Sequence, residues 1–239
     1  MAQRRDTKEG QERMNTHTWM ARRTCVLAAA LVLATDFAPT AQADDSYYLI
    51  VYAAQRAPTT PRFSHTFATV VKVTERGTDR SKCKVEEHTI SWIAKTKEIV
   101  LARAKSEPGA NLSLRESLRL AASLDEKISM WGPFEIKKEL YDRALKQIDL
   151  LESDKVQYKA LDVRFRPETA INCIHAVSDL DTDEGLLDTG AACGEVASRM
   201  VALHLRRWII RPETTHAWVI KRLGLEDYAI TRRIWDEWP

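Results

Sequence analysis

Long hydrophobic runs are missing from this sequence of 239 residues. The most apolar stretch, residues 25–34 (CVLAAALVLA), has about half of the roughly 20 residues that a membrane-spanning helix needs. A basic segment precedes it, and Ala41-Gln42-Ala43 follows with the small-x-small pattern that signal peptidase cleaves. We therefore predict a signal peptide over residues 1–43 and a secreted or periplasmic protein with no stable membrane span after cleavage. The long polar stretch ahead of the basic segment leaves open a translation start at Met14 or Met20.

An excess of basic charge is also missing. The chain has 36 Lys and Arg against 34 Asp and Glu, and residues 44–239 carry 30 of each. No segment gathers basic residues with interleaved aromatic residues, which is the footprint of a protein that binds the phosphate backbone. We therefore expect no nucleic-acid partner.

Cysteine is scarce, with four in the chain, and no Cys-x-x-Cys or His-x-x-x-His pair occurs. Such local pairs anchor most structural zinc ions, so we expect no cofactor and no metal. A zinc site assembled from His65, His88, Cys173 and His175 is the alternative. Beyond residue 43 the cysteines number three, so at least one thiol stays outside any intramolecular disulfide.

The hydrophobic pattern predicts a single α+β domain at residues 44–239. Runs of β-branched and aromatic residues indicate strands, whereas helical spacing and a capping box at Ser113 and Glu116 indicate helices. Trp131-Gly132-Pro133 is expected to break the chain between two helices. The expected strands are residues 46–53, 63–73, 85–93 and 156–163, and the expected helices are 113–124, 134–152, 173–181 and 190–210.

The connecting segments and the C-terminal end complete this picture. Residues 75–82 contain Gly77 and Asp79 and are typical of a hairpin connection. Four tryptophans fall within the last 32 residues, which favours a helical cover over residues 190–239, because large aromatic side chains bury much area. The acidic run at residues 179–184 is expected to be solvated surface.

Cys173 draws attention because it follows Asn172, a residue that often caps helices. A thiolate at the first helical position faces unpaired N–H groups and the positive end of the helix dipole, which favours the charged form. The alternative is a buried structural cysteine, since cysteine is often found in cores. His175 is not expected to act as its base, because residues two apart on a helix point in different directions.

His65 and His88 are the candidate bases. Both fall on the more apolar faces of their expected strands, where a core histidine is the alternative. A two-residue turn at Arg76-Gly77 would place them opposite each other, and a longer loop would place them diagonally. One imidazole could then orient the other.

The order of these residues resembles that of the circularly permuted papain-like thiol enzymes, the branch with the lecithin:retinol acyltransferase-like proteins and relatives of cell-wall peptidases. Asn172-Cys173-Ile174-His175-Ala176-Val177 is similar to the nucleophile motif of the acyltransferase group, and the order His65, His88, Cys173 also matches. The resemblance covers residues 47–182. It implies a permuted papain-like core with Cys173 as nucleophile, His65 as base and His88 as orienting residue. The chain departs from the family in lacking a glycine near His65 and in a longer spacing between the histidines.

The sequence therefore predicts a secreted cysteine-dependent hydrolase or acyltransferase that works through a cysteinyl thioester. The substrate class stays open among a cell-wall peptide, a lipid ester and a protein amide. The alternative is a non-catalytic envelope protein that uses a degenerate papain-like fold for binding or structure. A disulfide between Cys83 and Cys193 would leave Cys173 as the sole thiol of residues 44–239, but both could equally be buried thiols.

Overall fold

The computed structural model describes residues 45–74, 82–101, 105–161, 170–183 and 185–234. All of them belong to one compact unit, Ala43–Pro239. The expected signal peptide, nearly all of the hairpin connection and two of the C-terminal tryptophans, Trp235 and Trp238, lie outside these residues.

The α+β class is confirmed, with two sheets and five α-helices in the described part of the chain. The larger sheet has the strand order β3-β2-β1-β6-β9, and the smaller has the order β4-β5-β7-β8. The larger sheet consists of β1 (Asp45–Gln55), β2 (Ser64–Thr74), β3 (Lys84–Ile90), β6 (Lys127–Glu135) and β9 (Ile230–Arg233). The smaller sheet consists of β4 (Trp92–Ala94), β5 (Glu107–Asn111), β7 (Gln157–Tyr158) and β8 (Ala170–Ile171). The α-helices are α2 (Leu114–Ser123), α3 (Lys138–Leu151), α4 (Cys173–Ser178), α5 (Gly194–His204) and α6 (Ala217–Arg222).

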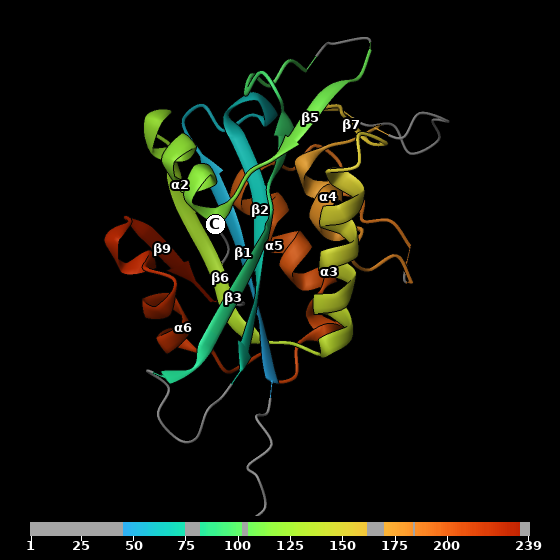
Figure 1. Ribbon diagram of the computed structural model, residues 1–239. Coiled ribbons are helices and arrows are strands. Elements are labelled where there is room, and N and C mark those ends of the chain that lie inside the picture. Colours follow the sequence, from blue (N-terminus) through green and yellow to red (C-terminus); the bar gives the residue numbers. More distant parts are fainter. Residues whose placement is uncertain (1–44, 75–81, 102–104, 162–169, 184, 235–239) are drawn as a thin grey trace, which may run out of the picture. The chain divides into compact units, whose positions relative to one another are not determined.

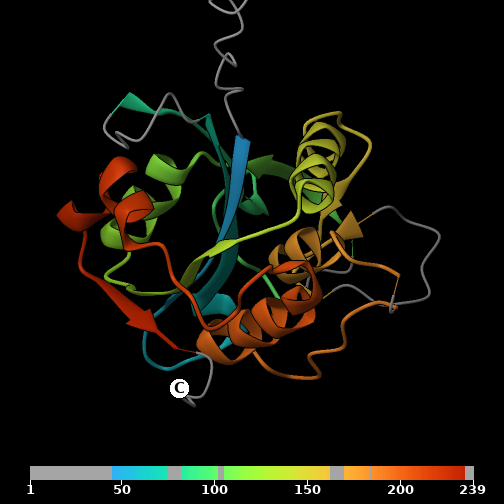
Figure 2. The ribbon, with the colours of Figure 1, turned by 90° about the horizontal axis from the view of Figure 1, so that it is seen from below.

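Helices cover both faces of the larger sheet. Figures 1 and 2 show α3, α4 and α5 on one face and α2 and α6 on the other. The strand β1 is buried along most of its length because it lies at the centre of this arrangement. Its odd-numbered residues, such as Leu49 and Val51, pack with α3, α4 and α5, and its even-numbered residues, such as Ile50 and Tyr52, pack with α2 and α6. The two faces of β1 and β2 therefore pack into separate hydrophobic clusters.

The strand β6 was not expected from the sequence. It runs through Trp131-Gly132-Pro133, where a break between helices was predicted, and α3 starts at Lys138 instead of residue 134. A register shift opposite Leu49 and Val51 accommodates the irregular segment. Gly132 has a φ of +100°, and a Cβ there would lie 2.6 Å from the Leu49 carbonyl oxygen. The glycine therefore allows the strand to continue past a proline, which central strands usually exclude.

The C-terminal part is less helical than expected. The predicted helix at residues 190–210 becomes α5 and the 3-10 helix η3 (Arg206–Trp208), and α6 and the 3-10 helix η4 (Leu225–Asp227) follow. The chain then ends its described part in β9, which pairs in parallel with β6. The regular elements in the described part of the expected cover over residues 190–239 are therefore helical except for β9, which completes the sheet edge.

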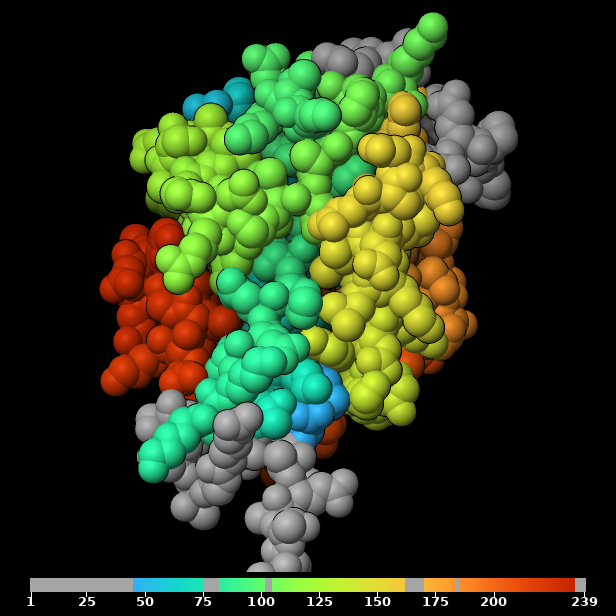
Figure 3. Space-filling view, in the orientation of Figure 1, coloured from blue at the N-terminus to red at the C-terminus, as the bar shows by residue number. Residues whose placement is uncertain are grey.

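At the opposite edge of the sheet lies β3, which Figure 3 shows on the surface between α2 and α3. Its charged residues Lys84 and Glu87 are exposed, and charged side chains protect an edge strand from pairing with other chains.

Among the described helices, none combines the length and the apolar character that crossing a membrane requires.

Candidate functional site

Cys173 begins α4, as the sequence predicted. The Asn172 side chain caps this helix by accepting hydrogen bonds of 2.9 Å each from the N–H groups of Ile174 and His175. Cys173 is 7% exposed and is not joined to another cysteine. Its backbone position is therefore fixed by the cap, and its side chain lies at the inner side of the helix start.

A cavity of about 350 Å³ adjoins this thiol, and we refer to it as the Cys173 pocket. It lies between the start of β2, the strand β7, the start of α4 and the loop before α5. None of the described residues that line it carries a charged side chain or an imidazole. The hydrogen-bonding side chains among them are Ser64, Thr66, Tyr158, Asn172 and Thr189, together with the thiols of Cys173 and Cys193.

His65 lies on the other face of the sheet. It pairs with Ala54, whose side chain packs in the core under α2 and α6. Ser64 and Thr66, its neighbours in β2, line the Cys173 pocket, and successive side chains of a strand point to opposite faces. The structure therefore separates His65 from Cys173 by the thickness of the sheet.

His88 is on the same face as Cys173 but further along the sheet. It pairs with Val70 instead of His65, and its ring lies 6.0 Å from that of Tyr141 in α3. Val70 is four residues beyond Thr66 in β2, which corresponds to roughly 13 Å along a strand. His88 does not line the Cys173 pocket, so the expected arrangement of Cys173, His65 and His88 is not assembled.

The structure also places His175 and the other two described cysteines, Cys83 and Cys193, away from any metal-binding cluster of described residues. Among the described residues, no group of three or more His, Cys, Asp and Glu side chains is placed to hold a metal ion. His175 points behind α4, where its Nε2 donates to the Leu187 carbonyl at 3.0 Å. Of the two alternatives for Cys83 and Cys193, the disulfide is not formed, and Cys83 is buried while Cys193 is partly exposed. Cys83 packs with Val71 and Val73 in a separate cluster, whereas Cys193 lines the Cys173 pocket.

His65 takes part in a buried polar chain instead. Its Nε2 lies 2.9 Å from Ser91 Oγ, which lies 2.7 Å from Ser117 Oγ in α2. Its Nδ1 is buried and makes no hydrogen bond to any described residue. Burial lowers the pKa of His65 to about 4, so the ring is neutral near pH 7. Ser91 is fully buried, and a serine in that position cannot reach a substrate.

A small cavity of about 30 Å³ adjoins His65 on this face. Its lining includes Ser117 and Glu126, and desolvation raises the pKa of Glu126 to about 7 against an opposing effect of Arg56. A volume of this size holds about one or two water molecules. This cavity is therefore too small for an organic substrate.

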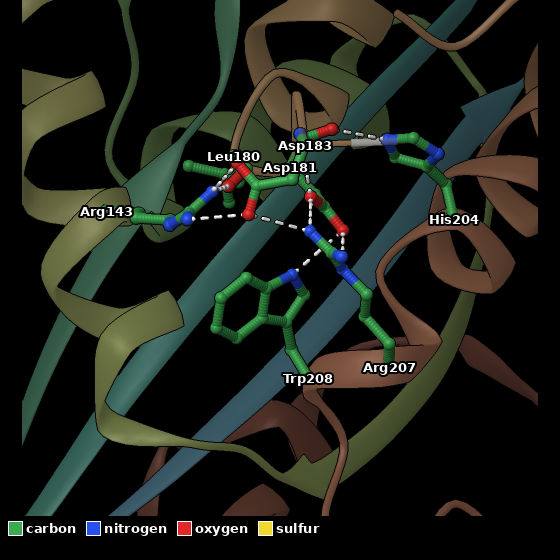
Figure 4. Close-up of polar contacts among 7 residues, drawn as sticks. All are labelled: Arg143, Leu180, Asp181, Asp183, His204, Arg207 and Trp208. Carbon is green, nitrogen blue, oxygen red and sulfur yellow. Dashed lines mark hydrogen bonds and ion pairs between the residues drawn. The ribbon is translucent and has the colours of Figure 1, made fainter. Parts of the chain in front are cut away.

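The acidic run at residues 179–184, which was expected to be solvated surface, is split: Asp183 is exposed, whereas Asp181 lies in a buried junction. Asp181 is fully buried and accepts hydrogen bonds from Arg207 and from the indole N–H of Trp208, the latter at 2.9 Å (Figure 4). Burial alone would raise the pKa of Asp181, but the hydrogen bonds from Arg207 and Trp208 lower it below its ordinary value. No local sequence signal indicated this contact, because Arg207 and Trp208 lie 26 and 27 residues beyond Asp181.

The same junction connects three helices on the Cys173 face. Arg143 of α3 donates to the Leu180 carbonyl at 3.2 Å and pairs with Asp183 at 2.9 Å (Figure 4). His204 of α5 donates to the Asp181 carbonyl at 2.7 Å. These contacts fix the end of α4 against α3 and α5, and thereby hold one side of the segment that leads to Cys193.

Comparisons with protein-family models, with curated proteins and with solved structures found no match. The geometry thus offers a thiol beside an uncharged cavity, without an acid or base among the described lining residues.

Proposed function

We propose that residues 45–234 form a non-catalytic binding domain of an exported protein, and that the Cys173 pocket holds a small, neutral, mostly apolar ligand. The observation that carries this proposal is the lining of the pocket. It combines apolar side chains such as Ile99, Leu161 and Ile174 with a few neutral hydrogen-bonding groups. Ligand pockets generally have this composition, and a volume of about 350 Å³ lies at the small end of their range.

The absence of charge in the described lining selects the ligand class. A buried charged group is stable only when it is paired or hydrogen-bonded, and none of the described lining side chains offers a countercharge. A neutral ligand can instead use Ser64 and Thr189 as hydrogen-bonding partners, whereas the Thr66 hydroxyl already pairs with Ser198 Oγ at 2.8 Å. The pocket therefore favours an uncharged molecule over the corresponding acid or amine.

The test uses indole and 1-octanol as neutral probes, and indole-3-acetate and octylamine as charged counterparts. The neutral probes are expected to raise the melting temperature, because ligands that bind only the folded state stabilise it. Ala192→Trp would fill the pocket and is expected to weaken probe binding at least tenfold, whereas Ala122→Trp on the exposed side of α2 leaves it unchanged. Equal binding by both variants, or binding by neither probe to the parent, would refute the proposal.

A thiol hydrolase or acyltransferase with a permuted papain-like core is the second candidate. It is favoured by the position of Cys173 at the start of a capped helix beside a cavity. Its substrate would be a cell-wall peptide, a lipid ester or a protein amide. It requires His65 as base, and His65 faces the core on the other side of the sheet.

The alkylation rate of Cys173 by iodoacetamide, measured against pH, separates the two candidates. The binding proposal expects the same profile in the parent and in His65→Phe, because the histidine does not contact the pocket. A profile that shifts to higher pH in His65→Phe would instead support an ion-paired nucleophile and the enzyme.

A further inference from the structure

We propose that Cys173 and Cys193 form a dithiol–disulfide pair that closes the Cys173 pocket when it is oxidised. The two residues are 20 positions apart in sequence, yet both line the same cavity. They are not joined to each other in the structure. The third described cysteine, Cys83, lies in another cluster and is not a partner for either.

Each thiol is positioned by an anchored helix start. Cys173 is the first residue of α4, which the Asn172 side chain caps. Cys193 directly precedes α5, where Gln55 Oε1 accepts a hydrogen bond of 2.8 Å from the N–H of Glu195. The helices α4 and α5 pack together in the same core. The pair thus lies on two neighbouring fixed elements, and the exposed residues just before Cys193 are the part that has to adjust.

Thiol–disulfide exchange supplies the chemistry, with a low-molecular-weight disulfide as oxidant. The thiolate of Cys193, the more exposed of the two, attacks one sulfur of the donor, forms a mixed disulfide and releases one donor thiolate. The thiolate of Cys173 then attacks the Cys193 sulfur and releases the second donor thiolate. Two electrons pass from the protein thiols to the donor, and the two thiol protons end on the released donor thiols.

The consequence for the pocket follows from disulfide geometry. A disulfide holds its two Cα atoms about 4.4–6.8 Å apart, so a bridge between Cys173 and Cys193 crosses the cavity that both residues line. In the oxidised form the space for a ligand is reduced. This last step rests on the proposed binding function, whereas the formation of the bridge does not.

The first experiment treats the full chain with oxidised glutathione, blocks remaining thiols with N-ethylmaleimide and maps the peptides by mass spectrometry. The expected product is a linked peptide pair containing Cys173 and Cys193, lighter by two hydrogen atoms and restored by dithiothreitol. Cys193→Ser and Cys173→Ser are expected to abolish it, and Cys83→Ser to leave it unchanged. Circular dichroism confirms that each variant is folded. Stable glutathione adducts without the link, links through Cys83, or no oxidation would overturn the proposal.

The second experiment separates this inference from the binding proposal. Indole binding is compared in the reduced parent, the oxidised parent and oxidised Cys193→Ser. We expect at least tenfold weaker binding only in the oxidised parent. If the bridge forms but the reduced protein binds no probe, the ligand proposal fails and the redox pair stands. If the reduced protein binds and no bridge forms, the redox pair fails and the binding function stands.

Discussion

At the scale of single residues, His65 shows how burial determines the chemistry of a side chain. One ring nitrogen contacts Ser91 and the other is buried without a hydrogen-bond partner among the described residues. A neutral imidazole tolerates this environment, whereas an imidazolium would carry an uncompensated charge in the core. His65 therefore acts as a core residue whose protonation opposes folding.

This environment predicts an acid-sensitive stability. The pKa of His65 is about 4 when folded and 6.5 as the ordinary value, so the unfolded chain binds more protons between these values. Stability is then lost as the pH falls from 6.5 toward 4, by up to about 3 kcal/mol. His65→Phe keeps a ring at this position. It is expected to make the free energy of unfolding, measured with urea from pH 4 to 8, less dependent on pH below 6.5. If His65→Phe loses as much stability below pH 6.5 as the parent, His65 is not the cause of the acid sensitivity.

Glu126 provides an internal comparison of opposite sign. Its folded pKa of about 7 exceeds the ordinary 4.5, so the folded chain binds more protons, and stability is lost as the pH rises from 4.5 through 7. In the same urea experiment, Glu126→Gln is expected to remove the loss of stability between pH 4.5 and 7. It is expected to leave the loss caused by His65 at acid pH unchanged.

Residue-level prediction from sequence succeeded where the cause was local. Asn172 could be identified as a cap because it acts on the next two N–H groups. The grouping of His65 with Cys173 failed because both faces of β2 are buried, so alternation could not tell which face α4 would cover. The burial of Asp181 was not predicted for a different reason, since its partners Arg207 and Trp208 follow α5 and are distant in sequence.

At the scale of elements, the start of α5 depends on one glycine. Gly194 has a φ of +58°, and a Cβ there would lie 2.0 Å from Gln55 Oε1. That oxygen caps the helix through Glu195. A side chain at this position would therefore strain the backbone and displace the capping group together.

Gly194→Ala is expected to lower the free energy of unfolding by about 2–4 kcal/mol, because the strain of a positive φ adds to the loss of a cap. Gly224→Ala is the matched control. Gly224 also has a positive φ, of +66°, but its Cβ would meet open space, so only about 1 kcal/mol is expected. Denaturant unfolding of both variants measures the difference, and equal losses would show that Gln55 has no capping role.

Element prediction from sequence followed the strength of local signals. The capping box at the start of α2 was found because Ser113 and Glu116 bond each other's backbone. The strand β6 was missed because glycine and proline ordinarily end an element, and only the partner strand β1 reveals the irregular register that accommodates them. The strand β9 was missed because its pairing depends on β6.

At the scale of the whole domain, the contacts of Asp181 join segments that are distant in sequence. The carboxylate is fully buried, and Arg207, which is 36% exposed, is its cationic partner. Removing one partner of a buried ion pair leaves the other charge uncompensated. This junction is therefore expected to contribute to the stability of the whole α3, α4 and α5 layer.

Arg207→Ala is expected to lower the free energy of unfolding by about 2–3 kcal/mol, less than for a fully buried pair because solvent reaches the guanidinium. Arg211→Ala is the control, since Arg211 is 59% exposed and pairs with Glu135 at 2.8 Å; its loss is expected to cost less than about 0.5 kcal/mol. Thermal and urea unfolding provide the measurement. Similar losses in the two variants would mean that the Asp181 junction is not a stabilising contact.

The parallel pairing of β9 with β6 has a consequence for the order in which the chain can fold during synthesis. The two strands are separated by α3, α4, α5 and α6, so β6 emerges from the ribosome long before its outer neighbour exists. Until residues 230–233 arrive, the edge of β6 exposes backbone N–H and C=O groups that can pair with other chains. The nascent domain thus has a vulnerable interval that ends only when its last strand is released, and a chain cut short before that point would keep the edge open.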